Sequence, residues 1–195
     1  MEKLLLASGS SRRKELLEQI GVHYQSASMD IDESVHVNEA PSDYVLRLAR
    51  EKAQAGIEGN PDMVVLAADT SVVVAGNILG KPVNAQAAFD MLRQLSGTTH
   101  QVLTAIAVVQ NIQGKVNVED QLVVTEVSFS AITDQQIEQY IQTGEPMGKS
   151  GAYGIQGKAA LFVEHLQGSY SNVVGLPLAE TGKLLERFNI PIWRD

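Results

Sequence analysis

LLLASGSSRRK, at residues Leu4–Lys14, is a short apolar run that stops at small residues and leads at once into three cations. Leu16, Leu17 and Ile20 follow at helical spacing, and Gly21 is a typical helix terminator. The pattern predicts a strand, a tight turn and a helix. Cations in a first helical turn face the positive end of the helix dipole, so helix stability alone does not favour them.

The three cations of this helix start, Arg12, Arg13 and Lys14, allow two interpretations. A bound anion would remove the conflict with the dipole, because the first backbone N–H groups of a helix are available to phosphate. A solvated basic helix start explains the same residues. This segment alone does not separate the two.

The composition is that of a globular protein. The chain has 195 residues, 44% hydrophobic and 19% charged, which predicts one domain with a substantial core. A net charge of −8 argues against broad binding to nucleic acid or to anionic membranes. The sequence has no cysteine, which excludes a disulfide, a thiol nucleophile and a zinc–thiolate site and agrees with a reducing compartment.

The sequence also lacks the patterns of membrane and export segments. No apolar run approaches the roughly 20 residues of a membrane-spanning helix. The first apolar run is too short for a signal peptide and leads directly into charge. We therefore expect a cytoplasmic protein with no nucleic-acid partner and no membrane partner.

Strand and helix patterns alternate along the chain, which predicts a mixed α/β fold with strands of both orientations. We expect strands at 4–6, 22–26, 63–75, 99–109, 116–130 and 161–166, and helices after residue 11, at 41–56, at 85–95, after 133 and at 177–188. The 63–75 strand is expected to break at Asp69-Thr70-Ser71, with a hairpin turn at Gly76-Asn77. The two long runs at 99–109 and 116–130 are predicted to pair antiparallel.

Asp69 lies inside VVLAADTSVVV, residues Val64–Val74, with apolar residues on both sides. An unpaired carboxylate buried there would be costly, so it needs a metal, a cation or hydrogen-bond donors. Such a carboxylate can act as a base or as a metal ligand. The alternative is an aspartate in a turn between two strands, bonded to backbone N–H groups.

Lys52 lies in the middle of the apolar helical stripe that Val45, Leu48 and Ala49 begin. An inward lysine either extends its stem past the core to solvent or reaches a ligand phosphate as a point charge. Arg47 and the other charged residues of this helix lie on the opposite side, where charges are ordinary.

Lys81 and Glu33 are further candidates. Lys81 stands between Gly80 and Pro82, which would fix a tight loop and aim the side chain, although a loop lysine is commonly just solvated. Glu33 lies in a polar, acidic segment at 29–40, where solvation and metal binding are the two alternatives.

The loop GKSGAYGIQG, residues Gly148–Gly157, can expose many backbone donors and approach a ligand closely. The overlapping GEPMGKS, residues Gly144–Ser150, resembles a Walker A motif but has three residues between its glycines where the motif needs four. It also follows a predicted helix and not a strand. We exclude a P-loop NTPase on these grounds.

Six segments, in order over nearly the whole chain, together resemble the Maf family of septum-formation-inhibitor-like nucleotide pyrophosphatases. They are LASGSSRR at 6–13, LAREKA at 48–53, AADT at 67–70, GKP at 80–82, SGAYGIQG at 150–157 and GSYSNVVGLP at 168–177. Each is weak alone, and the set is highly specific. The resemblance implies an elongated Maf/ITPase-like α/β fold with a mixed central sheet flanked by helices. It implies one domain over residues 1–195, with two lobes and the active site in the cleft between them.

The resemblance also implies hydrolysis of a nucleoside triphosphate to the monophosphate and pyrophosphate, with Mg²⁺ or Mn²⁺. The family's catalytic aspartate maps onto Asp69, its phosphate-contacting basic residues map onto Arg12, Arg13, Lys52 and Lys81, and Ser8 and Glu33 match positions linked to the same site. Glu33 and Asp69 are the expected metal ligands. Arg12, Thr70 and Gln156 together look like the branch that prefers dTTP and UTP. The family is also associated with arrest of cell division and with removal of non-standard nucleotides.

The residues and the resemblance point to the same chemistry. A triphosphate carries about four negative charges, which would account for cations from separate segments. We expect Asp69 to orient or deprotonate the water that attacks the α-phosphorus, and the basic residues to stabilise the pyrophosphate leaving group. The amide of Gln156 has one acceptor and two donors, enough to read a pyrimidine edge.

Other functions stay open at this point. A non-catalytic regulator that senses nucleotides and acts on the division machinery would use the same anion site, and a phosphatase would release orthophosphate one group at a time. A nucleic-acid-binding module is disfavoured, because the chain is acidic and its basic residues are dispersed. The long strands and the apolar end at Ile190–Trp193 would support a homodimer, or the terminal tryptophan folds back on the core.

Overall fold

The computed structural model describes residues 3–194. Its strands are β1 (Leu4–Leu6), β2 (Gln25–Ser26), β3 (Val64–Val74), β4 (Asn77–Leu79), β5 (Thr99–Ile112), β6 (Lys115–Phe129) and β7 (Val163–Gln167). Its helices are α1 (Ser11–Gln19), α2 (Pro41–Gly59), α3 (Ala85–Leu95), α4 (Asp134–Gln142), α5 (Tyr170–Val174) and α6 (Leu178–Arg187), with 3₁₀ turns η1 (Ser150–Ala152) and η2 (Lys158–Phe162). Over these residues, no helix combines the length and the apolar character needed to cross a bilayer. The expected mixed α/β class is confirmed.

The strands form one sheet in the order β2-β1-β3-β5-β6-β7, with β4 paired to β3. β1 runs parallel to both of its neighbours, β2 and β3, whereas β4 and β7 pair antiparallel with β3 and β6. Because β1 lies between β2 and β3, the chain crosses from one side of β1 to the other after β2. Open α/β sheets bind ligands beyond the carboxyl ends of their strands at such a switch point.

The chain divides into two compact units. The first comprises Met1–Asp69, Thr104–Val123 and Gly175–Asp195, and the second comprises Thr70–Leu103 and Val124–Val174. β3, β5 and β6 each contribute residues to both. The expected cleft between two lobes stays a prediction.

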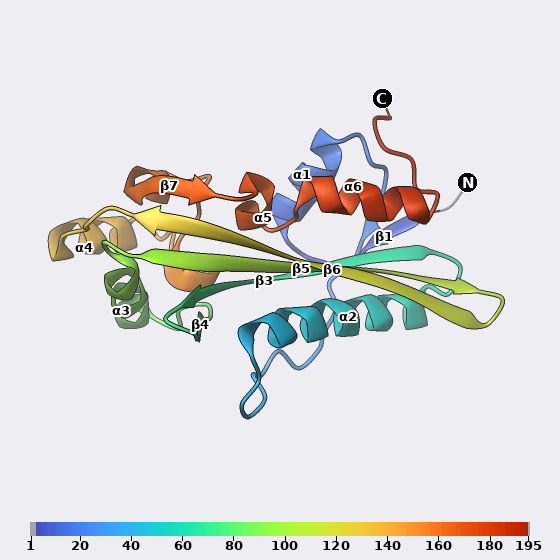
Figure 1. Cartoon of the computed structure of the whole chain (residues 1–195), viewed down its shortest axis with the longest axis horizontal. Helices are drawn as coiled ribbons and strands as arrows, with labels where there is room; N and C mark the ends of the chain where they lie inside the picture. The colour runs from blue at the N-terminus through green and yellow to red at the C-terminus, as the bar shows by residue number, and fades with distance from the viewer. Residues whose placement is uncertain (1–2, 195) are drawn as a thin grey trace. The chain divides into compact units, whose positions relative to one another are not determined.

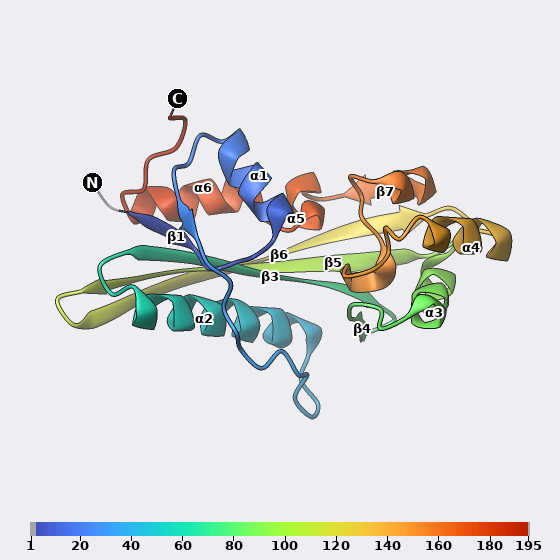
Figure 2. The same cartoon turned by 180° about the vertical axis from the view of Figure 1, so that it is seen from behind.

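In the first unit, helices cover both faces of the sheet. α2 lies along one face, and α1 and α6 lie along the other (Figure 1 and, from behind, Figure 2). The close fit of α2 depends on Gly56, since a Cβ there would lie 2.7 Å from Cγ1 of Val65 in β3. Leu17, Leu48 and Leu66 are fully buried in this core. The small residue therefore lets the helix backbone approach the strand that carries Asp69.

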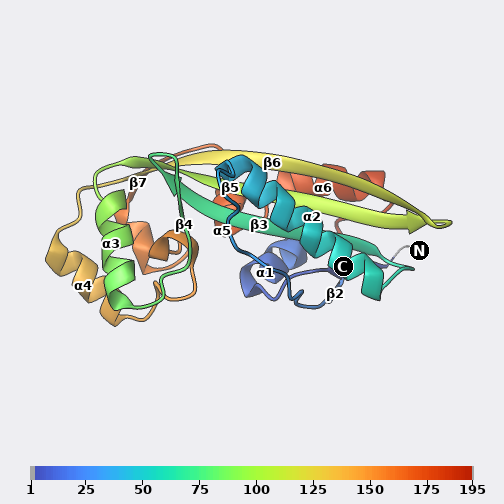
Figure 3. The same ribbon diagram turned by 90° about the horizontal axis from the view of Figure 1, so that it is seen from below.

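The second unit has its own apolar core, in which α3 and α4 lie side by side (Figure 3). Both helices begin where the sequence predicts. The side chain of Asn84 accepts a hydrogen bond from the Ala87 N–H at 2.8 Å and caps α3. Thr133 and Gln136 form both hydrogen bonds of the capping box of α4.

β3 differs from the sequence expectation at two points. It continues through Asp69–Ser71 without a break. The hairpin turn lies one residue earlier than expected, at Ala75 and Gly76, whose φ angles are 48° and 79°. A type I′ turn requires positive φ at both central residues. Alanine rarely adopts positive φ, so the sequence did not indicate Ala75 as a turn residue. Val74 accordingly pairs with Asn77, so that asparagine begins β4 and is not part of the turn.

Two features near the C-terminus also differ from expectation. Helix α5 was not expected, and its five residues are too few to show a helical period. The backbone N–H groups of Trp193 and Arg194 donate to the carbonyls of Ile20 and Gly21 at 2.8 and 3.0 Å, while the Trp193 side chain is 79% exposed. The chain end therefore folds back through its backbone, and not by burying its indole ring. A homodimer stays a prediction.

Gly151 is the position in the glycine loop where a side chain would cost most. Its φ is 68°, and a Cβ would lie 2.9 Å from the side chain of Val72. Alanine would combine left-handed strain with overpacking, so we expect Gly151→Ala to lower the free energy of unfolding by about 2–4 kcal/mol, measured by urea titration.

Gly148→Ala is the matched control for this substitution. Gly148 also has a positive φ, 75°, but nothing lies within 4 Å of its Cβ position. Its loss should be limited to the conformational cost of about 1–2 kcal/mol. Equal losses in the two variants would contradict the contact with Val72 as the cause.

His100 makes the second unit sensitive to acid. Its ring is fully buried, with Nε2 2.8 Å from Oη of Tyr153, and burial lowers the pKa of His100 from 6.5 to about 4. Between these values the unfolded chain binds more protons than the folded chain, so the free energy of unfolding falls as the pH falls through that window. We expect His100 to account for a loss of about 3 kcal/mol between neutral pH and pH 4.

Denaturant titrations of wild type and His100→Gln at several pH values measure this loss. His165→Gln is the control, since His165 is exposed on β7, and it should keep the wild-type pH dependence. An NMR titration of the His100 ring provides the pKa without a substitution. A ring that titrates near 6.5 in the folded protein would refute the assignment.

Candidate functional site

The register of β1 and β3 brings the first candidate residues together. Leu6 pairs with Leu66 in parallel, and the N–H of Ala7 donates to the Leu66 carbonyl at 2.8 Å. Ser8 therefore lies just beyond the carboxyl end of β1, and β3 continues in the same direction to Asp69. Both Ser8 and Asp69 are buried. The site begins at the carboxyl end of β1, the switch point of the sheet.

Ser8 also organises the start of α1. Its Oγ accepts hydrogen bonds from the Ser10 N–H at 3.2 Å and from Nη1 of Arg13 at 3.1 Å. Nε of Arg13 donates to the Gly175 carbonyl at 2.8 Å, which fixes the guanidinium in place. Among the described residues, no side chain caps α1 at Ser10, and its first turn holds no acidic residue. This helix start therefore has the character of an anion site.

The charges around Arg13 come from several segments. Burial lowers the pKa of Arg13, Asp69 and Glu33 act to raise it, and Arg12 acts to lower it further. The guanidinium of Arg13 therefore experiences the charges of Arg12, Asp69 and Glu33. Cations at the start of α1 face the positive end of the helix dipole. The carboxylates of Asp69 and Glu33 offset this repulsion, as a bound anion would.

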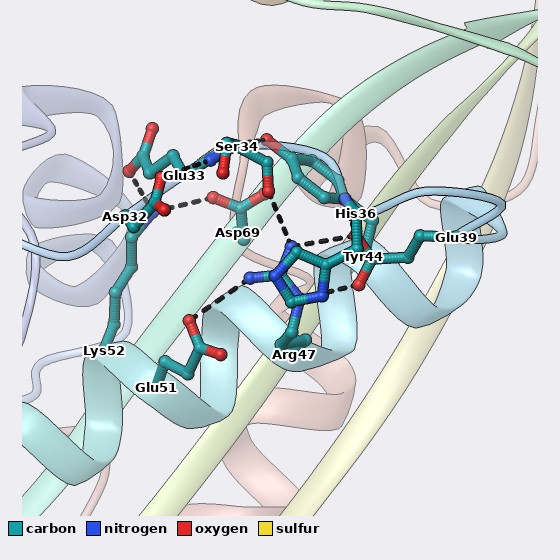
Figure 4. A network of polar contacts seen from close by, with 10 residues as sticks. All are labelled: Asp32, Glu33, Ser34, His36, Glu39, Tyr44, Arg47, Glu51, Lys52 and Asp69. Carbon is teal, nitrogen blue, oxygen red and sulfur yellow. Dashed lines mark hydrogen bonds and ion pairs between the residues drawn. The ribbon is translucent and has the colours of Figure 1, made fainter.

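Lys52 joins the two carboxylates, as Figure 4 shows. Its Nζ lies 2.7 Å from Oε1 of Glu33 and 2.8 Å from Oδ1 of Asp69. Lys52 is buried in α2, so the lysine does not extend past the core to solvent. A buried ammonium needs such partners, because an unpaired charge in the interior is costly. Contact of Lys52 with a phosphate stays a prediction.

Asp69 has the cation that a buried carboxylate requires. It lies within β3 and is held by the side chain of Lys52. The alternative of a turn aspartate bonded to backbone N–H groups is therefore wrong in its geometry. Asp69 thus pairs with a basic residue of another element, Lys52 of α2, and its functional role stays a prediction.

Two further residues of α2, which the sequence pattern did not single out, hold the loop that carries Glu33. Oη of Tyr44 donates to the Glu33 carbonyl at 2.8 Å, and Nη2 of Arg47 donates to the Ser34 carbonyl at 2.9 Å. Burial, Asp69 and Glu33 raise the pKa of Tyr44 to about 12. Tyr44 lies about two helical turns before Lys52 on the same face of α2. This spacing is the sequence signal that could have indicated Tyr44.

The second unit carries Thr70, Lys81 and Gln156. The Thr70 carbonyl accepts a hydrogen bond from Oγ of Ser150 at 3.3 Å, and the Gly80 carbonyl accepts one from the Gly151 N–H at 3.1 Å. The segments of Thr70 and Lys81 therefore border the glycine loop that contains Gln156. Lys81 and Gln156 are exposed. Their joint action with the residues of the first unit stays a prediction.

The glycine loop is braced on both sides of Gln156. Tyr153 meets His100, as described above. The carboxylate of Glu145 accepts hydrogen bonds from the N–H groups of Lys158 and Ala159 at 2.9 and 3.3 Å. The segment directly after Lys149 is the three-residue 3₁₀ turn η1 and not an α-helix, which agrees with the exclusion of a P-loop. The loop is thus a fixed frame that presents an exposed amide.

Glu33 and Asp69 are the carboxylates that could hold a divalent cation. Within residues 3–194, no group of three or more His, Asp or Glu side chains is arranged to hold a metal. Mg²⁺ commonly uses one or two carboxylates together with substrate phosphates and water. Glu33 and Asp69 could supply the carboxylates of such a site. They are too few to coordinate a metal ion without substrate or water ligands.

Comparisons with known proteins identify the relatives of this chain. The Maf-like protein family matches residues 3–188. A dTTP/UTP pyrophosphatase of Hahella chejuensis is 52% identical over 196 residues, which cover 99% of this chain and 96% of the relative. A dTTP/UTP pyrophosphatase of Shigella sonnei is 50% identical over 190 residues, which cover 97% and 94%. The solved structure of a HAM1 protein from Coxiella burnetii matches with a TM-score of 0.50 at 16% identity, over 96% of this chain and 100% of that one, and is similar in fold. With its ordered motifs and the match over residues 3–188, the chain belongs to the Maf-like protein family.

Proposed function

We propose that this chain is a nucleoside triphosphate pyrophosphatase that hydrolyses dTTP and UTP to the monophosphate and pyrophosphate. The observation that carries the proposal is the buried ammonium of Lys52 between Glu33 and Asp69. Relatives at 50–52% identity over nearly the whole chain bear the name of that activity.

The basic residues supply the binding of the triphosphate. Arg12 and Arg13 lie at the start of α1, where the first backbone N–H groups also suit phosphate oxygens. The planar fork of arginine can bind two oxygens of one phosphate, while Lys52 and Lys81 act as point charges. These four cations together would offset the roughly four negative charges of the substrate.

Asp69 is the residue proposed to act on the attacking water. Its carboxylate orients the water or accepts its proton as the water oxygen bonds to the α-phosphorus. The bond from the α-phosphorus to the bridging oxygen breaks, and pyrophosphate leaves with that electron pair. Cations near this oxygen stabilise the leaving group. A divalent cation such as Mg²⁺ or Mn²⁺, held by Asp69 and Glu33 with substrate oxygens, would add charge neutralisation when bound.

Base selection is the role proposed for Gln156, which the family resemblance pairs with Thr70 and Arg12. The amide of Gln156 offers one acceptor and two donors to a pyrimidine edge. The bracing of its loop by Glu145 and Tyr153 supports this role, because a fixed amide discriminates better than a mobile one. The absence of cysteine supports a reducing, cytoplasmic location for the enzyme.

The proposal predicts that Asp69→Asn loses activity while the chain stays folded, because Glu33 still pairs with Lys52 in this variant. We expect pyrophosphate release from dTTP, with Mg²⁺ or Mn²⁺, to fall by about 100-fold or more. Asp62→Asn, an exposed aspartate just before β3, is the control and should stay within about twofold of wild type. Circular dichroism checks that both variants are folded.

Product identity separates the alternatives in the same assay. A folded Asp69→Asn protein with near-normal turnover would remove Asp69 from the chemistry. Orthophosphate as the first product would indicate a phosphatase. A wild-type chain that binds dTTP and releases no product would favour a nucleotide-sensing regulator.

Gln156→Ala should change selectivity more than phosphate binding. We expect the ratio of kcat/KM for dTTP to that for CTP to fall by about tenfold, the value of one or two hydrogen bonds. Inhibition by pyrophosphate should stay close to wild type. Gln135→Ala, an exposed glutamine at the start of α4, is the control. An unchanged order of preference among dTTP, UTP and CTP would count against the role.

A further inference from the structure

We propose that Arg47 is a positioning residue. It maintains the ion pair between Glu33 and Lys52 by fixing the backbone of the loop that carries Glu33. The inference rests on the proposed function, because it concerns the same site. Arg47 lies on α2 five residues before Lys52. The helical pattern places Arg47 on the side of α2 where charges are ordinary, so its contacts give it a role that this pattern did not suggest.

The loop that carries Glu33 has little to order it from within. Residues 27–40 contain neither helix nor strand. Val35 and Val37 are 52% and 92% exposed, so the apolar side chains of this loop bury little surface. Segments with few buried apolar contacts open easily unless polar contacts hold them. The position of Glu33 must therefore be set by a neighbouring element, and that element is α2.

Arg47 binds this loop at two points, as Figure 4 shows. Its Nη2 donates to the Ser34 carbonyl at 2.9 Å and to Oε2 of Glu39 at 2.8 Å, and its Nε donates to Oε1 of Glu39 at 2.6 Å. The Glu39 carboxylate also accepts a hydrogen bond from the His36 N–H at 3.0 Å. One guanidinium thus joins a carbonyl directly after Glu33 to a side chain near the end of the loop.

The pair of Arg47 and Glu39 is well shielded from solvent. Their side chains are 18% and 9% exposed. The hydrogen bond from Arg47 is the main cause that lowers the pKa of Glu39 to about 2, and Glu39 in turn raises the pKa of Arg47. Both groups stay charged at neutral pH, and the bidentate geometry is one that only arginine provides.

Tyr44 completes the support of the loop backbone. Its hydroxyl donates to the Glu33 carbonyl, and the centroid of its ring lies 5.5 Å from Cζ of Arg47. Tyr44 and Arg47 therefore hold two consecutive carbonyls, and the Glu33 carboxylate reaches Nζ of Lys52 from that fixed backbone. Arg47 acts on the site through the placement of Glu33.

α2 also provides a matched control. Arg50 lies one turn after Arg47 on the same helix and makes a bidentate ion pair with Asp120 of β6, at 2.6 and 3.1 Å. Arg50→Gln removes the same charge and the same type of pair from the same helix. It leaves the contacts of the Glu33 loop intact.

The first measurement is amide hydrogen exchange in residues 31–39, followed in wild type, Arg47→Gln and Arg50→Gln. We expect exchange in this loop to accelerate by about tenfold or more in Arg47→Gln alone, with exchange in β3 unchanged in all three. This readout does not depend on catalysis. Equal protection of the loop in Arg47→Gln and Arg50→Gln would overturn the proposal.

The second measurement is pyrophosphate release from dTTP. We expect Arg47→Gln to lower kcat by about 10-fold to 100-fold, as a misplaced site residue does, while Arg50→Gln stays within about twofold of wild type. Arg47→Lys should restore little, because lysine cannot bridge Ser34 and Glu39 as a planar fork does. Recovery of full activity in Arg47→Lys would contradict the positioning role.

A double-mutant cycle separates this role from general stabilisation. If Arg47 acts through Glu33, Arg47→Gln should cost less than about twofold in kcat when Glu33→Gln is already present. Full additivity of the two losses would overturn the inference. A wild-type chain without pyrophosphate release would refute the proposed function, and the exchange measurement would still decide the role of Arg47.

Discussion

The ion triplet of Glu33, Lys52 and Asp69 is the constraint on which the site depends. Asp69 lies within a strand surrounded by apolar residues, and Lys52 lies in the apolar stripe of a helix. Removal of one partner from a buried ion pair is strongly destabilising, because it leaves an uncompensated charge in the interior. The two elements must therefore pack at a distance that lets the ammonium meet both carboxylates. Gly56 permits this approach by leaving no side chain between α2 and Val65 of β3.

The topology of the sheet explains why the basic start of α1 follows a strand that pairs with β3. β1 is parallel to β3, so the turn after β1 and the start of α1 lie beside the continuing strand that carries Asp69. α1 brings Arg12 and Arg13 to that point, and Ser8 fixes the guanidinium of Arg13. The strand β1, the small-residue turn after it and the cations of α1 act together. The strand fixes where the turn lies, and the turn fixes where the cations lie.

Much of this arrangement could be predicted from local signals in the sequence. The strand before Ala7, the helix after it and the caps at Asn84 and Thr133 each depend on a few consecutive residues, and they are confirmed. β3 was expected to break because three polar residues interrupt an apolar run. Whether such residues stay in a strand depends on partners elsewhere, here the ammonium of Lys52.

The rest of the site depends on contacts that no local pattern contains. Lys52 was identified as inward-facing from its helical position, but its two carboxylate partners lie 17 and 19 positions away in the chain. Tyr44 and Arg47 were missed because each donates to a backbone carbonyl of an irregular loop, and every residue has such an acceptor. The family resemblance supplied the assignments of Thr70 and Gln156 and the phosphate role of Lys81, which the geometry of each unit separately does not test.

The brace of the glycine loop has a consequence for protein engineering. Glu145 binds the main-chain N–H groups of Lys158 and Ala159, which every residue except proline supplies. Gly157 leaves the space that this carboxylate fills, and the buried Tyr153 contacts His100. The exposed residue between them contributes nothing to the brace through its side chain. Libraries of amino acids at position 156 can therefore be built on an unaltered scaffold, with residues 145, 153 and 157 kept constant.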